Sequence, residues 1–180
     1  MDELIDIVDQ KGNYIGKTCW KSEAHKYGYY HNTAHVWLYT LDKKILLQKR
    51  ALTKKVYPGI WDISVAGHVS AGEKIKIAAI REAKEEIDFI IKPEKLHKIY
   101  VRRHQFRHKN GIIDNEFHHV FISELTDSID NLRIQKLEVD EVKLFDLAIL
   151  NKTNKHKDIL LPEYQNYYSF VYNKIKDILT

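Results

Sequence analysis

Cysteine is almost absent from this sequence, with Cys19 as the single example among 180 residues. One cysteine excludes an internal disulfide and suits a reducing compartment. Long apolar runs are also missing, because no stretch approaches the roughly 18 residues that a membrane-spanning helix needs. The first residues lack the basic-then-apolar layout of an export signal. We therefore expect a cytoplasmic protein that does not enter the membrane.

Charge is never concentrated in a tail or block. The sequence carries 29 Lys and Arg against 25 Asp and Glu, a formal net charge of +4. The basic residues are spread along the chain in short pairs such as Lys43-Lys44 and Arg102-Arg103. This modest excess suits a small phosphate-bearing ligand and makes nucleic acid an unexpected partner.

Internal repeats and low-complexity linkers are absent too, which predicts a single domain over residues 1–180. Alternating apolar residues and turn residues predict the strands Leu4–Val8, Tyr14–Cys19, His35–Leu41, Ile45–Lys49, Trp61–Ala66, Leu96–Phe106, Ile112–Ile122 and Val142–Asp146. Capping and spacing predict a short helical turn begun by Ser22 and ended by Gly28, a helix Glu73–Ile87 and a closing helix Pro162–Leu179. Such a mixture predicts an α/β (α+β) fold with a mixed sheet covered by helices.

Three glutamates gather on one face of the predicted helix Glu73–Ile87. Glu82, Glu85 and Glu86 have the i, i+3, i+4 spacing, nearly opposite the apolar face. Their mutual repulsion costs some tenths of a kcal/mol per pair, so we expect a cation to offset it. Mg²⁺ prefers carboxylate oxygens and accepts phosphate oxygens in its remaining positions. The spacing alone leaves a solvated acidic face as an alternative.

The segment that begins at Gly67, GHVSAGEKIKIAAIREAKEEIDF, resembles the Nudix box, G-x5-E-x7-R-E-U-x-E-E-x-G-U, where U is a bulky aliphatic residue. The matching residues are Gly67, Glu73, Arg81, Glu82, Glu85 and Glu86. At roughly 7% usage per residue, such a match is expected about once in ten million starting points. Ala83 is smaller than the usual aliphatic residue, and Asp88 replaces the last glycine. Because Asp tolerates a left-handed backbone, we expect the metal ligands to be unaffected.

The resemblance implies the Nudix α/β/α sandwich with a mixed β-sheet. It also implies an enzyme, a Mg²⁺-dependent hydrolase that cleaves a diphosphate linkage, with Mn²⁺ as an alternative cation. The implied metal ligands are Gly67 through its carbonyl, Glu82, Glu85 and Glu86, and the implied structural ion pair is Glu73 with Arg81. The expected partner is a small-molecule diphosphate, either a nucleoside diphosphate derivative or a related organic diphosphate. A homodimer is one option for the oligomeric state.

The proposed chemistry, in-line attack of an activated water on phosphorus, needs a general base within hydrogen-bond reach. The first candidate is Glu141, in the acidic LEVDEV segment that we expect to be a loop. Glu138 and Asp140 in the same segment compete for this role, and Glu116 is a further candidate. Glu85 counts among the catalytic residues as one of the implied metal ligands.

Outside the box, the segments KRALTKKVYPGIWDISVAGHVSAGE and GIIDNEFHHVF resemble the metal-dependent isopentenyl diphosphate isomerases, which are related to these hydrolases. This resemblance implies Arg50 and Lys54 as a diphosphate-binding pair. It also matches His35, His68 and the Asp114-Asn115-Glu116 triplet to parts of the isomerase metal site, and it makes His35 and His68 further candidates for substrate binding.

Ala66 stands where the isomerase has a cysteine, and a methyl group transfers no proton. Hydrolysis is therefore favoured over two alternatives, the isomerase itself and a non-catalytic domain that binds nucleotide or RNA.

Overall fold

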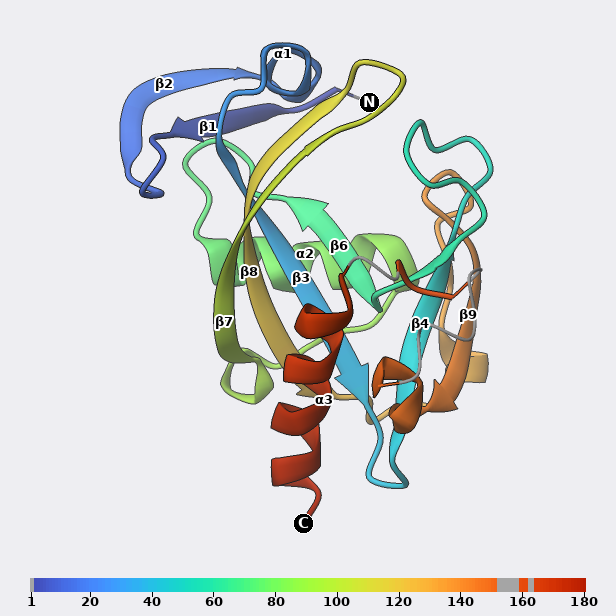
Figure 1. Cartoon of the computed structure of the whole chain (residues 1–180). Helices are drawn as coiled ribbons and strands as arrows, with labels where there is room; N and C mark the ends of the chain where they lie inside the picture. Colours follow the sequence, from blue (N-terminus) through green and yellow to red (C-terminus); the bar gives the residue numbers. More distant parts are fainter. Residues whose placement is uncertain (1, 152–158, 162–163) are drawn as a thin grey trace.

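Strands from all parts of the chain meet in one sheet that lies between two helices (Figure 1). The computed structural model describes residues 2–151, 159–161 and 164–180, and within them the mixed sheet has nine strands. The strands are β1 (Leu4–Val8), β2 (Tyr14–Trp20), β3 (His31–Tyr39), β4 (Lys44–Arg50), β5 (Trp61–Asp62), β6 (Val65–His68), β7 (His97–Arg107), β8 (Ile113–Glu124) and β9 (Val139–Asp146). The helices are α1 (Lys21–Tyr27), α2 (Ile75–Ile87) and α3 (Gln165–Ile178), with 3₁₀ turns η1 (Pro93–Lys95), η2 (Ile129–Asn131) and η3 (Leu147–Asn151).

The strand β3 is the centre of the sheet. It runs parallel to β8 over its whole length and antiparallel to β6 on its other side. The strands β3 and β4 pair only at Tyr39 and Ile45, after which β4 separates and pairs with β9 and β5. The predicted strands His35–Leu41 and Ile45–Lys49 are therefore joined by a turn, and β3 and β4 diverge beyond it.

Each face of the sheet is covered by one helix, which confirms the predicted α/β/α sandwich. Helix α3 lies over one face, where Trp37, Val120 and Tyr168 are part of a buried cluster. Helix α2 lies over the other face, where Ala79 and Ala83 pack in a second cluster. Small residues let the backbone of α2 approach the sheet closely, because short side chains leave little between helix and strand. This close approach brings Glu82 of α2 against Gly67 of β6.

The predicted strand Trp61–Ala66 is wrong as one element, because the structure divides it into β5 and β6. β5 pairs with β4 and β6 pairs with β3, so the chain crosses the gap between the diverging strands. The hydroxyl of buried Ser64 fills this gap: it accepts from the Leu38 N–H at 2.8 Å and donates to the Leu46 carbonyl at 2.5 Å. Satisfying these two backbone groups offsets the cost of the missing ladder bonds.

Several predicted helix boundaries also change. Helix α1 begins at Lys21, so Ser22 is not its cap, and the Ser22 hydroxyl donates to Asp2 at 2.6 Å. Gly28 ends this helix in the left-handed conformation, as predicted. Helix α2 begins at Ile75 rather than Glu73. The predicted start of the closing helix at Pro162 lies outside the described residues.

Apolar and aromatic residues at helical spacing form one face of helix α3. The buried residues of this face are Tyr167, Tyr168, Val171 and Ile175. Ile178 does not belong to the buried part, because it is 52% exposed in the last turn of the helix. Among the described residues, no helix has the length and apolar character that crossing a membrane would need.

Candidate active site and metal centre

Gly67 of β6 lies directly against Glu82 of α2. A Cβ atom added to Gly67 would lie 1.9 Å from Cδ and 2.3 Å from Oε1 of Glu82. No side chain larger than hydrogen fits there, so glycine is required at this position for space rather than for backbone conformation. The structure thus brings two of the predicted metal ligands into contact.

The three glutamates of α2 differ in burial. Glu86 is 5% exposed, and its Oε2 accepts from Gln48 Nε2 at 3.0 Å and from the Ala66 N–H at 3.3 Å. Glu82 is 8% exposed, whereas the Glu85 side chain is 52% exposed. The three carboxylates therefore lie at different depths, with Glu86 the most buried and Glu85 nearest to solvent.

Burial raises the pKa of Glu82 to about 7 and that of Glu86 to about 8. The negative charge of Glu82 raises the pKa of Glu86 further, and the charges of Glu3 and Glu85 raise the pKa of Glu82, because like charges disfavour ionisation. The buried Oε1 of Gln48 has no hydrogen-bond partner within the described residues and supplies another oxygen beside Glu86. Such a donor set, rich in oxygen and short of positive charge, fits a hard divalent cation.

Arg81 holds the loop and the helix together. Its Nε and Nη2 donate to the two oxygens of Glu73 at 2.9 Å each, and Nη2 also donates to the His68 carbonyl at 2.9 Å. Its Nη1 donates to Glu82 at 2.8 Å and to Glu85 at 3.1 Å. The ion pair expected between Glu73 and Arg81 is present, and the same guanidinium orients two candidate ligands.

The metal-free protein should lose stability as the pH rises from about 5 to about 8. Because the folded-state pKa values of Glu82 and Glu86 lie above the usual value of 4.5, the folded state keeps protons that the unfolded state has released. The free energy of unfolding therefore falls across this window, while Mg²⁺, which binds the ionised carboxylates, should stabilise increasingly. Thermal unfolding at pH 5.5, 7 and 8.5, with and without Mg²⁺, measures both trends.

Glu86→Gln removes one of these titrating groups and serves as the control for that experiment. It should flatten the pH dependence of the metal-free protein and reduce the effect of Mg²⁺. A Mg²⁺-induced shift of the melting temperature that is equal at all three pH values would contradict the prediction.

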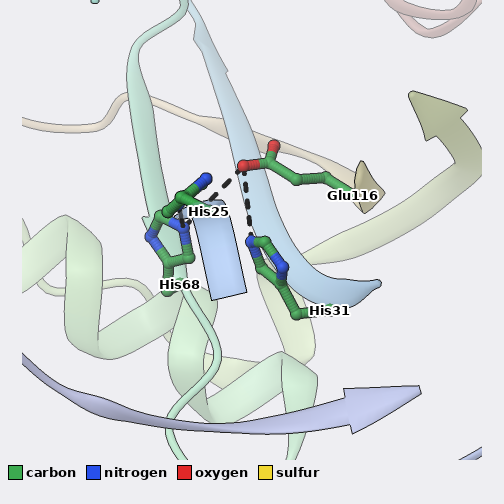
Figure 2. A group of neighbouring side chains, drawn as sticks. All are labelled: His25, His31, His68 and Glu116. Carbon is green, nitrogen blue, oxygen red and sulfur yellow. Dashed lines mark hydrogen bonds and ion pairs between the residues drawn. The ribbon is translucent and has the colours of Figure 1, made fainter. Parts of the chain in front are cut away.

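A second group of candidate ligands lies on the opposite face of β6. His25, His31, His68 and Glu116 come from α1, β3, β6 and β8, and each offers one ligand atom, all within 4.8 Å of one another. Figure 2 shows the three rings and the carboxylate directed toward one another. Glu116 Oε1 lies 3.5 Å from His31 Nε2 and 3.8 Å from His68 Nε2. Imidazole nitrogens with one carboxylate are a donor set that suits Zn²⁺ or Mn²⁺.

The two groups lie back to back because successive residues of a strand point to opposite faces. Gly67 meets Glu82 of α2, while the side chain of His68 joins the histidine group. The register of β3 with β8 sets His31 beside Glu116. Burial works against ionisation of Glu116, but His118 and His31 face its oxygens and hold its pKa well below the usual range.

His35 is not part of this group, contrary to the metal-site role that the sequence suggested for it. It lies four residues beyond His31 on β3, about 13 Å along the strand. Its Nδ1 lies 3.2 Å from the Tyr167 hydroxyl, and its ring centroid is 4.0 Å from that of His118. His25 and His31 take the place that we expected for His35. His25 and His31 lie close to His35 in the sequence, but the resemblance matched only His35 and His68 to the histidines of the isomerase metal site.

Further polar side chains follow the histidine group along the α3 face. His118 Nε2 donates to Glu116 Oε2 at 2.8 Å, and the Tyr164 hydroxyl lies 3.1 Å from His104 Nε2. Arg102 lies over the rings of Tyr164 and Tyr167, at 4.3 and 5.1 Å from their centroids. Burial lowers the pKa of His104 to about 4 and that of His35 well below its usual value. We define the polar face as Arg102, His35, His104, His118, Tyr164 and Tyr167.

The predicted diphosphate-binding pair is engaged with acceptors of its own chain. Arg50 Nε donates to the Val56 carbonyl at 3.1 Å, and its Nη1 lies 3.3 Å from Asp62. Lys54 forms an ion pair with Glu138. The positive charge of Lys54 nevertheless acts on Glu86 and opposes the rise of its pKa. Lys54 therefore lies on the glutamate side of the site.

The first candidate for the general base is placed differently from the expectation. Glu141 lies in strand β9 and not in a loop, where it is exposed and pairs with Lys49. The neighbouring Val142 packs on the α2 side of the sheet. Because residues alternate along a strand, Glu141 points away from the glutamate side. Asp140 is a further exposed acid of this strand, 3.7 Å from Lys49.

The chain is similar to known proteins. A family model described as NUDIX domain matches residues 29–164. An uncharacterized Nudix hydrolase of Clostridium acetobutylicum is 30% identical, covering 98% of this chain and 98% of its own. Isopentenyl-diphosphate Delta-isomerase 2 of Photorhabdus laumondii is 34% identical over 68% of this chain and 67% of its own. A solved structure from Deinococcus radiodurans has a TM-score of 0.68 at 16% identity, covering 93% of this chain and 98% of its own, which indicates a common fold.

Proposed function

This chain belongs to the Nudix family, and we propose that residues 1–180 form one Nudix domain that hydrolyses a diphosphate linkage with a divalent cation. The substrate class is a nucleoside diphosphate derivative or a related organic diphosphate. The observation that carries the proposal is the contact of Gly67 with Glu82 beside buried Glu86. Two buried carboxylates with raised pKa values are costly unless a cation binds them, so function rather than stability accounts for their presence.

Glu82, Glu85 and Glu86 would hold Mg²⁺, which when bound neutralises charge on diphosphate oxygens and activates water for attack on phosphorus. Glu85 is the exposed carboxylate of the three, and Arg81 fixes its position at 3.1 Å. It is therefore the group best placed to accept a proton at the solvent side. Lys54 would exchange its ion pair with Glu138 for the diphosphate, since a phosphate oxygen is an equivalent acceptor.

The group of His25, His31, His68 and Glu116 would hold a second cation, for which Mn²⁺ fits better than Mg²⁺ because of its nitrogen donors. The two centres share β6, and Arg81 binds the His68 carbonyl between them. A change in the position of β6 would therefore act on both centres together.

The polar face favours a polar organic group on the diphosphate. Arg102 forms no ion pair within the described residues, and His118 Nδ1 is buried there without a hydrogen-bond partner. A prenyl chain over this face would leave such groups unsatisfied, at a cost of about 1–3 kcal/mol each. A nucleoside offers hydroxyls, ring nitrogens and an aromatic face for the same groups. Nucleoside diphosphate derivatives are thus preferred over prenyl diphosphates.

The isomerase is the second candidate, and the histidine group is the observation that favours it. The enzyme from Photorhabdus laumondii bears the name of that activity. Ala66 argues against it, because its methyl group packs in the core beneath α3 and can neither donate nor accept a proton. An isomerase would need another acid at this position.

The test is hydrolysis of nucleoside diphosphates, nucleotide sugars and prenyl diphosphates with Mg²⁺ or Mn²⁺, measured as release of phosphate or, from nucleotide sugars, of nucleoside monophosphate and sugar phosphate. We expect metal-dependent release from the nucleoside compounds and at least tenfold less from prenyl diphosphates. Release from prenyl diphosphates alone would overturn the preference for nucleoside diphosphate derivatives. Double-bond migration in isopentenyl diphosphate without phosphate release would replace the hydrolase by the isomerase.

A further inference from the structure

The carboxylate of Asp114 lies between two histidines at the start of β8. Its Oδ1 accepts from His25 Nδ1 at 3.0 Å, and its Oδ2 accepts from His108 Nε2 at 2.6 Å. The side chains of Asp114 and His108 are 16% and 8% exposed, so solvent competes little for either bond. Because the carboxylate can only accept, each imidazole must place its N–H toward it.

This arrangement determines which nitrogen His25 presents to its neighbours. With the proton on Nδ1, held also by the Ile113 carbonyl at 3.3 Å, the unprotonated nitrogen is Nε2. His25 Nε2 lies 3.1 Å from His68 Nε2, inside the group of candidate ligands. In the neutral ring, the lone pair of His25 is therefore directed toward the other candidate ligands.

His108 is itself fixed by the other side of the site. It begins the turn between β7 and β8, and its ring contacts Phe106 and Tyr57, with centroids at 4.7 and 5.4 Å. Tyr57 belongs to the loop of residues 51–60, hereafter the β4–β5 loop, which also carries Lys54. Asn110 of the same turn donates to the Lys55 carbonyl of this loop at 2.8 Å. Two contacts thus connect the turn to the loop.

We propose that Asp114 and His108 are positioning residues of the metal centre, with Asp114 orienting His25 and His108 joining Asp114 to the β4–β5 loop. The inference rests on the proposed second cation site. Asp114 is then an outer partner of a ligand and not a ligand itself, because both of its oxygens are used by histidines. Outer partners of this kind typically change metal affinity by about 10- to 100-fold.

The experiment is a Co²⁺ titration followed by visible absorption, in the presence of excess Mg²⁺ to occupy the glutamate site. His108→Ala and Asp114→Ala should each weaken Co²⁺ binding by roughly 10-fold or more. His108→Gln, whose amide N–H can donate to Asp114, should restore most of the affinity. His97→Ala, an exposed histidine at the start of β7, is the matched control and should bind as the unaltered protein does.

Thermal unfolding of the metal-free variants separates loss of binding from loss of the fold, and His108→Asn provides a polar variant too short to reach Asp114. Unchanged Co²⁺ affinity in folded His108→Ala and His108→Asn overturns the inference. An effect of Asp114→Ala without any effect of His108→Ala overturns it too, since Asp114 then acts as a ligand. Absence of Co²⁺ binding to the unaltered protein overturns both this inference and the second cation site, while phosphate release tests the hydrolase separately.

Discussion

Glu86→Gln is expected to lower kcat for diphosphate hydrolysis by roughly a thousand-fold, because it removes a metal ligand worth several kcal/mol of charge stabilisation, at 1.36 kcal/mol per tenfold. The amide has nearly the same shape as the carboxylate, so the packing of α2 against the sheet should persist. The substitution also removes the buried carboxyl group of Glu86, whose pKa is about 8. We therefore expect a metal-free protein that is at least as stable at pH 8 as the unaltered one.

Steady-state phosphate release and thermal unfolding, measured on the same preparations, test this expectation. Glu94→Gln is the matched control, because Glu94 is an exposed glutamate of η1 and should tolerate the change. Glu85→Gln should also lower activity strongly while leaving stability almost unchanged, since Glu85 is exposed. A fully active Glu86→Gln protein would remove the glutamates of α2 from the mechanism.

Gly67→Ala is expected to reduce activity by about 100-fold, as a shift of about 1 Å in a catalytic group can do. The added methyl group would lie 1.9 Å from Cδ of Glu82, so β6 and α2 must separate or Glu82 must leave its position. Overpacking of this kind also costs about 1–3 kcal/mol of stability. Mg²⁺ affinity from calorimetric titration, kcat and the melting temperature should all decrease.

A double-variant cycle identifies the cause. Gly67→Ala combined with Glu82→Ala removes the clash, so stability should recover whereas Mg²⁺ affinity and activity should not. Equal stability of Gly67→Ala and the unaltered protein would mean that the contact is not restrictive.

The box region could be predicted closely because its information is local. The helix was expected at Glu73–Ile87 and is found at Ile75–Ile87, and Asp88 takes the left-handed conformation, with φ of 56°, where the box has glycine. Helical periodicity decides which of its residues share a face, so the glutamate set followed from spacing. The turn at Asn110-Gly111 is local in the same way, since an Asn-Gly pair is a strong hairpin signal by itself.

The histidine group could not be predicted in the same way. Its members come from four elements, and the nearest signal was a pair of histidines, His31 and His35, on the same face of one strand. The choice between them depends on the register of β3 against β8, which sets His31 and not His35 opposite Glu116. The position of Glu141 in β9 has the same origin, because pairing with Lys49 converts an apparent loop into a strand.

By itself, the sequence determined the family resemblance and the helix that carries Glu82, Glu85 and Glu86, because both depend on residues a few positions apart. The α/β/α layers were expected only because the resemblance implied them. Only the tertiary structure decided which histidines meet Glu116, which carboxylates are buried enough to have raised pKa values, and that Gly67 and His68 serve opposite faces of β6. Those outcomes depend on strand register, on the close approach of α2 and on desolvation. They arise between segments that lie far apart in the chain.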